Sequence, residues 1–548
     1  MSRGDVMEEA AIKARIGLQG LGDSAERVWL KAGTKLGRGV SKSLRDSLQE
    51  PQKDKLKFEF RAIKGFDVPA VPPCIHQVDG LVSFQVAEIR TRHGRRDFDS
   101  SIFHTVLERI HMETQRGFSR IGSLSLDFFS CPPDVQLPLV AELLHSSPSI
   151  AELSLVNVPL GNSGMKLLAA GCEGGGVLRS LTLHSIGVDE GGASSLGRII
   201  YLNSSLTVLS LNDLALSFNG GKMVGEALMS NSTLMSLSLR NARLGPLGMG
   251  IFSPCLANKV SLQKLDLHGN DIQNFGLMQV LSAMSELRSI RCLDLSCNCI
   301  DGYFIMNLTG LVDHRNGLES LKIGGMHRME IYLPALLNLP MITHLKELDL
   351  SETARGSEFL TLFAVGLASL KHLVWLGLSS LSLKAEEILV LSRSLSSLES
   401  LEHLNFSRNF IGQQGMIALA NTNFARMSRL TALDLALNDL GPVGSICLCS
   451  CLDTFSNLTS LDLSHNQLGA VGGQQLISAI PRHLKGLKSL GMAGNMLGDR
   501  GGEHLVEEVL VNRQVEYVNL SGNGLSEECV EYIREICDSL EICIEINQ

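Results

Sequence analysis

Two groups of cysteines are the first candidates for chemistry in this sequence of 548 residues. A structural zinc site needs four convergent ligands, typically supplied as CxxC-like pairs. Neither group has that spacing, so we interpret both as small buried thiols and expect no metal. The groups are Cys447, Cys449 and Cys451 on a predicted helix, and Cys292, Cys297 and Cys299 on a predicted strand and its turn.

Two glycine-rich segments are the candidates for a phosphate-binding loop. Gly171–Gly176 and Gly220–Met223 both lack the Lys-Ser/Thr pair that follows the glycines of such a loop. No HExxH motif, GxSxG motif or isolated pair of acids stands out elsewhere. We therefore expect no bound nucleotide, no cofactor and no enzymatic activity.

The charge balance and the cysteine content restrict the partner and the compartment. The chain has 57 acidic and 48 basic residues, so a net charge of −9 offers no broad positive field to nucleic acid. Met1–Gly20 has no long apolar core, and no segment has about 18 unbroken apolar residues, so we expect neither a secretion signal nor a membrane span. Thirteen cysteines cannot all pair internally, which favours reduced thiols in the cytoplasm, with cytoskeleton, cilium or nucleus as alternatives.

A repeated sequence motif, here called the phrase, predicts the strands and helices that position any functional residue. An aliphatic residue, two variable residues, an aliphatic, one variable residue and a third aliphatic recur at intervals of 27 to 29 residues. This regularity is the strongest signal in the chain. The phrase begins at Ile121, Ile150, Leu178, Leu206, Leu234, Leu262, Ile290, Leu318, Leu345, Leu373, Leu401, Leu430, Leu458, Leu487 and Val515.

Each unit reads as a short strand, a turn and a helix. The last three residues of the phrase alternate with the period of a strand, so their aliphatic side chains share one face. An asparagine often follows, and its amide can satisfy backbone groups left unpaired at the turn and form a ladder with its neighbours. The period then becomes helical; in the unit from Leu458, for example, Val471, Leu476, Ile477 and Ile480 are predicted to line one helical face.

The phrase, the repeat length near 28 and small-residue turns such as Leu468-Gly469-Ala470 resemble the ribonuclease-inhibitor-like class of leucine-rich repeats. The resemblance covers roughly Ile121 to Leu525. It implies an α/β leucine-rich-repeat solenoid, a horseshoe with a parallel sheet on the concave face and helices on the convex face. One repeat cannot bury its apolar face alone, but stacked repeats form a continuous core.

We divide the chain into a partly disordered polar arm (1–60), a cap with a degenerate first repeat (61–120), about fifteen repeats (121–525) and a C-terminal cap (526–548). In the first cap, Leu81–Val86 resembles a degenerate strand. In the last, Ser526–Leu540 is predicted to be a helix and Ile542–Ile546 a strand. The arm is either disordered or a docking element anchored by Trp29 and Leu30.

Three consecutive units, those from Leu318, Leu345 and Leu373, lack the asparagine. Met326 occupies its position in the first of them. One interpretation is a tolerated packing defect that bends the superhelix, and the other is a partner-specific bulge.

The variable strand positions point into the predicted concavity and are the candidate partner-binding residues. An inner face of small residues offers few anchors, and a few large or charged side chains normally dominate an interface. We predict that four of them form one adjacent charged patch that faces solvent, with an exposed tryptophan further along; a functionally silent inner face is the alternative. The candidates are Arg240, Asp266, His268, Asp294 and Trp375.

These features favour a non-catalytic protein–protein interaction scaffold, with a cytoskeletal or ciliary assembly as one setting. A GTPase-activating protein resembling the Ran-activating family is an alternative, although the acidic tail typical of that family is missing. A cytosolic immune-sensor-like repeat protein is another, although such receptors carry a nucleotide-binding module that this sequence lacks. We predict protein partners on the concave face or the arm, and no nucleic acid.

Overall fold

In a computed structural model of the chain, the structure describes most of residues 150–547 and four earlier strands. The described residues before 150 are 15–19, 55–62, 81–88, 120–127, 138, 140–142 and 144–145, and the gaps after 150 are 175–177, 258, 285–286, 288, 303–317, 328–331, 333–335, 338–341, 354–359, 422–426, 511–514 and 541. The predicted anchors Trp29 and Leu30 lie outside the described residues. Two compact units, Met1–Ser289 and Ile290–Gln548, divide the chain, and each is described by itself. The predicted parallel sheet is therefore described within each unit.

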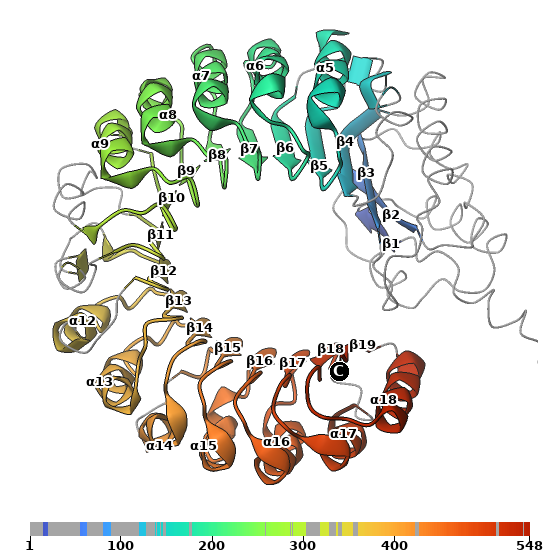
Figure 1. The fold of residues 1–548 in the computed structure, drawn as a ribbon, viewed down its shortest axis with the longest axis vertical. Helices are drawn as coiled ribbons and strands as arrows, with labels where there is room; N and C mark the ends of the chain where they lie inside the picture. The colour runs from blue at the N-terminus through green and yellow to red at the C-terminus, as the bar shows by residue number, and fades with distance from the viewer. Residues whose placement is uncertain are drawn as a thin grey trace, which may run out of the picture. The chain divides into compact units, whose positions relative to one another are not determined.

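The first unit is a sheet with helices on one side (Figure 1). β1 and β2 pair antiparallel, and every later neighbour from β2 to β9 pairs parallel. The strands are β1 (Arg15–Gln19), β2 (Lys55–Ala62), β3 (Leu81–Glu88), β4 (Arg120–Asp127), β5 (Glu152–Val156), β6 (Ser180–His184), β7 (Val208–Asn212), β8 (Ser236–Ser238) and β9 (Lys264–Asp266). The α-helices are α5 (Gly161–Gly171), α6 (Ala193–Leu202), α7 (Ser217–Leu228), α8 (Gly245–Phe252) and α9 (Gln273–Met284).

The second unit repeats this arrangement with parallel pairing from β10 to β19. Its strands are β10 (Cys292–Asp294), β11 (Ser320–Lys322), β12 (Glu347–Asp349), β13 (Trp375–Gly377), β14 (His403–Asn405), β15 (Ala432–Asp434), β16 (Ser460–Asp462), β17 (Ser489–Gly491), β18 (Tyr517–Asn519) and β19 (Cys543–Glu545). Its α-helices are α12 (Leu360–Leu367), α13 (Ala385–Leu395), α14 (Gly412–Asn421), α15 (Gly441–Cys449), α16 (Gly469–His483), α17 (Gly498–Leu505) and α18 (Glu527–Leu540).

The period predicted both the fold and the register of the strands. Both units show the α/β architecture of a leucine-rich-repeat solenoid. The strands stack in register, as in β15 and β16, where Leu433 lies opposite Leu461. The second and third apolar residues of the phrase are buried throughout the described repeats, so the core of each unit is a stack of apolar layers, mostly of leucine. α18 and β19 occupy the segments where the terminal helix and strand were expected, and β3 covers the expected degenerate strand.

Two small parts of the sequence interpretation are wrong or incomplete. Val471 was assigned to the buried face of α16, but 64% of it is exposed, while Leu476 and Ile477 are buried. At 100° per residue, Val471 lies well off the stripe formed by the two later residues. Gly473 occupies the buried side of that first turn instead, close to Leu497 of the next repeat. Strands β1 and β2 were not foreseen.

The asparagine ladder is confirmed. In the second unit, Nδ2 of Asn466 donates to Leu463 O at 2.9 Å in its own repeat and to Leu435 O at 2.8 Å in the preceding one. Its Oδ1 accepts the backbone N–H of Asn438 at 3.0 Å. Asn466 N–H in turn donates to Oδ1 of Asn495 at 2.9 Å, so each amide links its turn to the neighbouring turn.

The ladder is partly replaced where the asparagine is missing. Thr353 stands in that position in the unit from Leu345, is buried, and donates from Oγ1 to the carbonyl of Leu350. Leu381 stands there in the next unit, and its backbone N–H is satisfied by Oδ1 of Asn409 one repeat later. These units therefore retain the turn with fewer side-chain hydrogen bonds.

Asn466→Ala should lower the free energy of unfolding by about 2 kcal/mol or more, because it leaves several buried backbone groups without partners. Urea denaturation followed by circular dichroism measures the change. Asn457→Ala is the matched control, since Asn457 is exposed and donates to Ser428 O. An equal effect of the two substitutions would contradict a structural role for the ladder.

A fully buried lysine is the unexpected element of the first unit. Lys259 stands three residues before the first leucine of its repeat, where Asn231 stands in the preceding one. Its ammonium donates to Leu228 O at 2.8 Å and to Asn231 O, and so caps carbonyls at the end of α7. Burial lowers the pKa of Lys259 below its ordinary value of 10.5.

The lysine makes the stability of this unit depend on pH. Because its folded-state pKa is lowered, the unfolded chain binds more protons between that pKa and 10.5, so the free energy of unfolding should rise with pH in this window. Urea denaturation at a series of pH values up to the ordinary lysine pKa of 10.5 measures the rise. In Lys259→Met, this part of the rise should be absent, while titration of the thiols should affect both proteins. If the free energy of unfolding had the same pH dependence in the two proteins, the proposed effect of Lys259 would be wrong.

Candidate partner-binding site

The side of each sheet that faces away from the helices, here called the open face, carries the candidate residues. Leucines alternate with these residues along each strand and point into the core. In β8 and β9, the open face presents the aligned pair Ser238 and Asp266. Arg240 and His268 follow two residues later, one on each strand's turn.

Asp266 does not face solvent as predicted. Only 6% of it is exposed. Oδ1 accepts the backbone N–H of His268 at 3.2 Å, Oδ2 accepts the hydroxyl of Ser238 at 3.1 Å, and Nη1 of Arg240 lies 3.5 Å from Oδ2. Asp266 is therefore the buried centre of a hydrogen-bonded cluster, since short strands and close neighbours leave little room above it.

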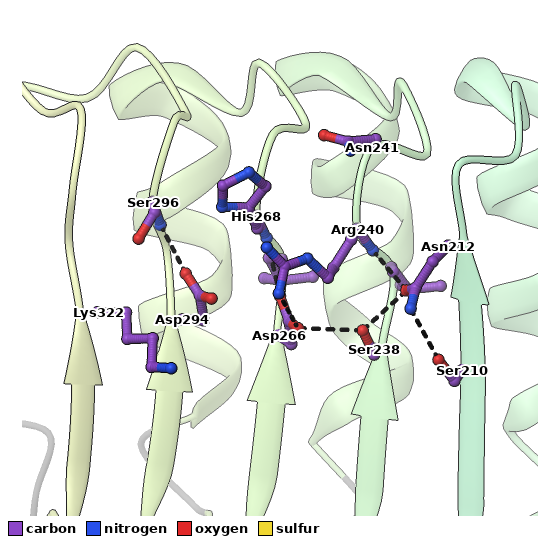
Figure 2. Close-up of polar contacts among 12 residues, drawn as sticks. Ser210, Asn212, Ser238, Arg240, Asn241, Asp266, His268, Asp294, Ser296 and Lys322 are labelled. Atoms are coloured by element: carbon purple, nitrogen blue, oxygen red, sulfur yellow. Dashed lines mark hydrogen bonds and ion pairs between the residues drawn. The ribbon is translucent and has the colours of Figure 1, made fainter. Parts of the chain in front are cut away.

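The same correction applies to Asp294 of the second unit. It is 9% exposed, and its Oδ1 accepts the backbone N–H of Ser296 at 3.0 Å (Figure 2). The two aspartates thus hold the turns that follow their strands.

This contact recurs along the open face. An Asp or Asn at the end of the strand accepts the backbone N–H two residues later, at distances of 2.8 to 3.2 Å. Asp and Asn commonly make such turns. The sequence therefore contained a signal for the structural role of this column. The pairs are Asp266–His268, Asp294–Ser296, Asp349–Ser351, Asn405–Ser407, Asp434–Ala436, Asp462–Ser464 and Asn519–Ser521.

A lateral hydrogen-bond chain connects Asp266 to the neutral side of the first unit (Figure 2). Oδ1 of Asn212 lies 2.8 Å from Oγ of Ser238 and accepts the backbone N–H of Arg240 at 3.1 Å. Nδ2 of Asn212 donates to Oγ of Ser210 at 2.9 Å. The chain crosses three strands and fixes the backbone from which the Arg240 side chain projects.

Arg240 and His268 are the exposed members of this cluster. The Arg240 side chain is 42% exposed, and Asp266 engages it through one nitrogen of the guanidinium. His268 is half-buried in the turn that follows the neighbouring strand. On β6, His184 faces Asp213 at 3.2 Å, and both side chains are about one third exposed. Of the predicted residues on these strands, this surface therefore presents the guanidinium of Arg240 and the imidazole of His268, while the carboxylate of Asp266 is buried.

Trp375 lies in the second unit, where it forms a separate cluster with Lys322. The indole ring covers Gly377, because a Cβ atom there would lie 2.6 Å from the ring. The ammonium of Lys322 is 5.4 Å from the ring centroid, a cation–π distance, and 3.7 Å from Glu347. Trp375 is half-buried and projects away from the core, as expected, and it packs against side chains of preceding strands.

Carboxylates remain accessible further along the second unit. Asp434 and Asp462 are paired in register on β15 and β16 and are half-buried. Burial, followed by the nearby charge of Asp462, raises the pKa of Asp434 above its usual value, although the hydrogen bond from Ala436 opposes the shift.

The cysteine groups give a mixed result. Cys451 is buried and Cys449 half-buried, and burial raises the pKa of Cys449 to about 11 and of Cys451 to about 12. Cys297 and Cys299 are exposed, so the prediction of burial is wrong for them. Both stand on the turn with φ of 57° and 52°, conformations that belong to the loop rather than to the core.

One comparison with known proteins agrees with the repeat geometry. A family model described as a leucine-rich repeat matches residues 286–302, 397–420, 428–449 and 456–476. The chain is built of leucine-rich repeats. A solved internalin from Listeria monocytogenes is similar at 18% identity, with a TM-score of 0.38, over 64% of this chain and 82% of the internalin. No curated protein matches.

Among the residues that the structure describes, no helix combines the length and apolar composition that crossing a membrane requires.

Asp266→Lys should lower the free energy of unfolding by about 3 kcal/mol, because it places an unpaired charge in a buried site and removes the cap of the turn. Arg240→Gln should change it by less than about 1 kcal/mol, since the guanidinium is half exposed. Urea denaturation of both variants tests the difference. A fully stable Asp266→Lys protein would show that the carboxylate is not structural.

Proposed function

We propose that this protein is a non-catalytic scaffold of the ribonuclease-inhibitor-like class that binds a protein partner on the open face of its first unit. Two features support the class. The repeats are near 28 residues long, and an α-helix follows each strand from β5 to β9 and from β12 to β18. Leucine-rich repeats in general serve protein interaction, and the open face of each sheet offers aligned side chains to a partner.

One observation carries the location of the site. The Arg240 guanidinium projects from a backbone that Asn212 fixes, and the buried Asp266 holds one edge of it. An arginine held in this way loses little conformational freedom when it binds, and arginine is enriched among residues that dominate interfaces. Arg240 and His268 are therefore the proposed contacts, and Asp266 positions the first of them.

Trp375 is the proposed anchor of the second unit. Lys322 restrains one side of its ring, while part of the residue stays accessible. Tryptophan is also enriched among dominant interface residues. Asp294 acts here as a structural residue of its turn.

A finer version of the proposal places the scaffold in a cytoskeletal or ciliary assembly of the cytoplasm. It rests on the repeat architecture and the sequence composition, and the identity of the captured partner tests it.

Arg240→Gln should reduce partner binding by tenfold or more, equivalent to about 1.4 kcal/mol or more, while the fold stays intact. Affinity purification with quantitative mass spectrometry identifies proteins captured by the wild type, and titration of the purified partner measures affinity. Arg198→Gln is the matched control, because Arg198 is an exposed arginine on α6 of the same unit, 60% accessible and paired with Glu173.

Equal affinity of the wild type and Arg240→Gln for the captured partner would place the contact elsewhere. Loss of binding in Arg198→Gln alone would move it to the helices.

A further inference from the structure

Six large apolar side chains on the outward faces of α7, α8 and α9 are exposed to solvent. Each helix contributes two of them, which lie three to five residues apart along the chain. The grid, as we name these six residues, comprises Phe218 (39% exposed) and Met223 (39%) on α7, Leu247 (66%) and Ile251 (40%) on α8, and Phe275 (56%) and Met278 (44%) on α9.

The three helices pack closely because glycines on α8 let its neighbours approach. A Cβ atom at Gly248 would lie 3.3 Å from the backbone of Phe218 on α7. A Cβ atom at Gly250 would lie 3.6 Å from the ring of Phe275 on α9. The grid is therefore one surface rather than three separate pairs of residues.

The grid is not needed for the core of the unit. Each of these helices already buries an opposite face, as Met249 and Phe252 of α8 and Leu277 and Val280 of α9 do. A surface helix normally places polar residues on its outer face. Exposed apolar patches of this extent are typical of interaction sites.

The grid carries almost no charge. α8 and α9 contain no acidic or basic residue. On α7, Lys222 and Glu226 lie 3.9 Å apart and balance each other. A partner that binds here cannot be selected by charge, and the lack of excess basic residues argues against anionic lipid. The complementary surface must be apolar and uncharged, as the grid itself is.

We propose that the grid is the centre of an interface between two copies of this chain related by a two-fold axis. An uncharged apolar surface is complementary to itself, which a two-fold interface requires. Six side chains of these types at 39–66% exposure present on the order of 500 Å². A standard interface buries about 800 Å² on each partner, so the grid alone supplies more than half of that area.

This interface uses the helices and leaves the open face free. The proposal is therefore independent of the proposed function.

Sedimentation equilibrium of the full chain, up to high micromolar concentration, tests the proposal. The wild type should approach twice the chain mass of 59.4 kDa. The double variant Leu247→Asp/Phe275→Asp should remain at 59.4 kDa. Both substitutions fall in the first turn of a helix, where an acidic residue is favourable, so the fold should be retained, as circular dichroism can verify.

The matched control is Val443→Asp/Val471→Asp on the adjacent helices α15 and α16 of the second unit. These valines occupy the same helical position and are 47% and 64% exposed. The control variant and Arg240→Gln should both dimerise like the wild type.

A monomeric wild type at all concentrations would overturn the proposal. So would dissociation of the control variant to the same degree as the grid variant. A monomer that cosediments with neutral phosphatidylcholine vesicles through the grid would assign the surface to lipid instead.

Discussion

The turn after each strand is the constraint on which the rest of the structure depends. A chain that reverses every repeat leaves buried N–H and C=O groups that no strand or helix can pair. Asn466 and its equivalents supply the missing donors and acceptors from side chains, and each bonds both its own turn and the neighbouring one. Where the asparagine is present, it links neighbouring turns and so helps to fix the spacing between their repeats.

The open face follows from the same constraint. Where a strand ends in aspartate, the carboxylate holds the N–H two residues later and becomes part of the turn. Asp266 is also bonded by Ser238, so its charge is used within the protein. The side chains available to a partner lie two residues beyond the strand-end column. Arg240 is one of them, and these hydrogen bonds orient its exposed guanidinium.

The helices are constrained by their packing against one another rather than by hydrogen bonds at the turns. Helices of neighbouring repeats must approach closely, and the glycines of α8 permit it. Once each helix has buried its inner face, folding does not require any particular residue type on its outer face. The apolar character of the outer faces of α7, α8 and α9 is therefore surplus to the requirements of the core.

The sequence by itself determined the repeat, its strand register and the α/β solenoid, because the periodicity is local and recurs in every repeat. It also determined the asparagine ladder in those repeats that carry the asparagine. It also placed Arg240, Asp266 and His268 on one surface. Burial depends on side chains contributed by neighbouring repeats, which no single phrase contains. Only the tertiary structure therefore decided that Asp266 and Asp294 are buried caps, that Val471 is exposed and that Lys259 is buried beneath a helix end.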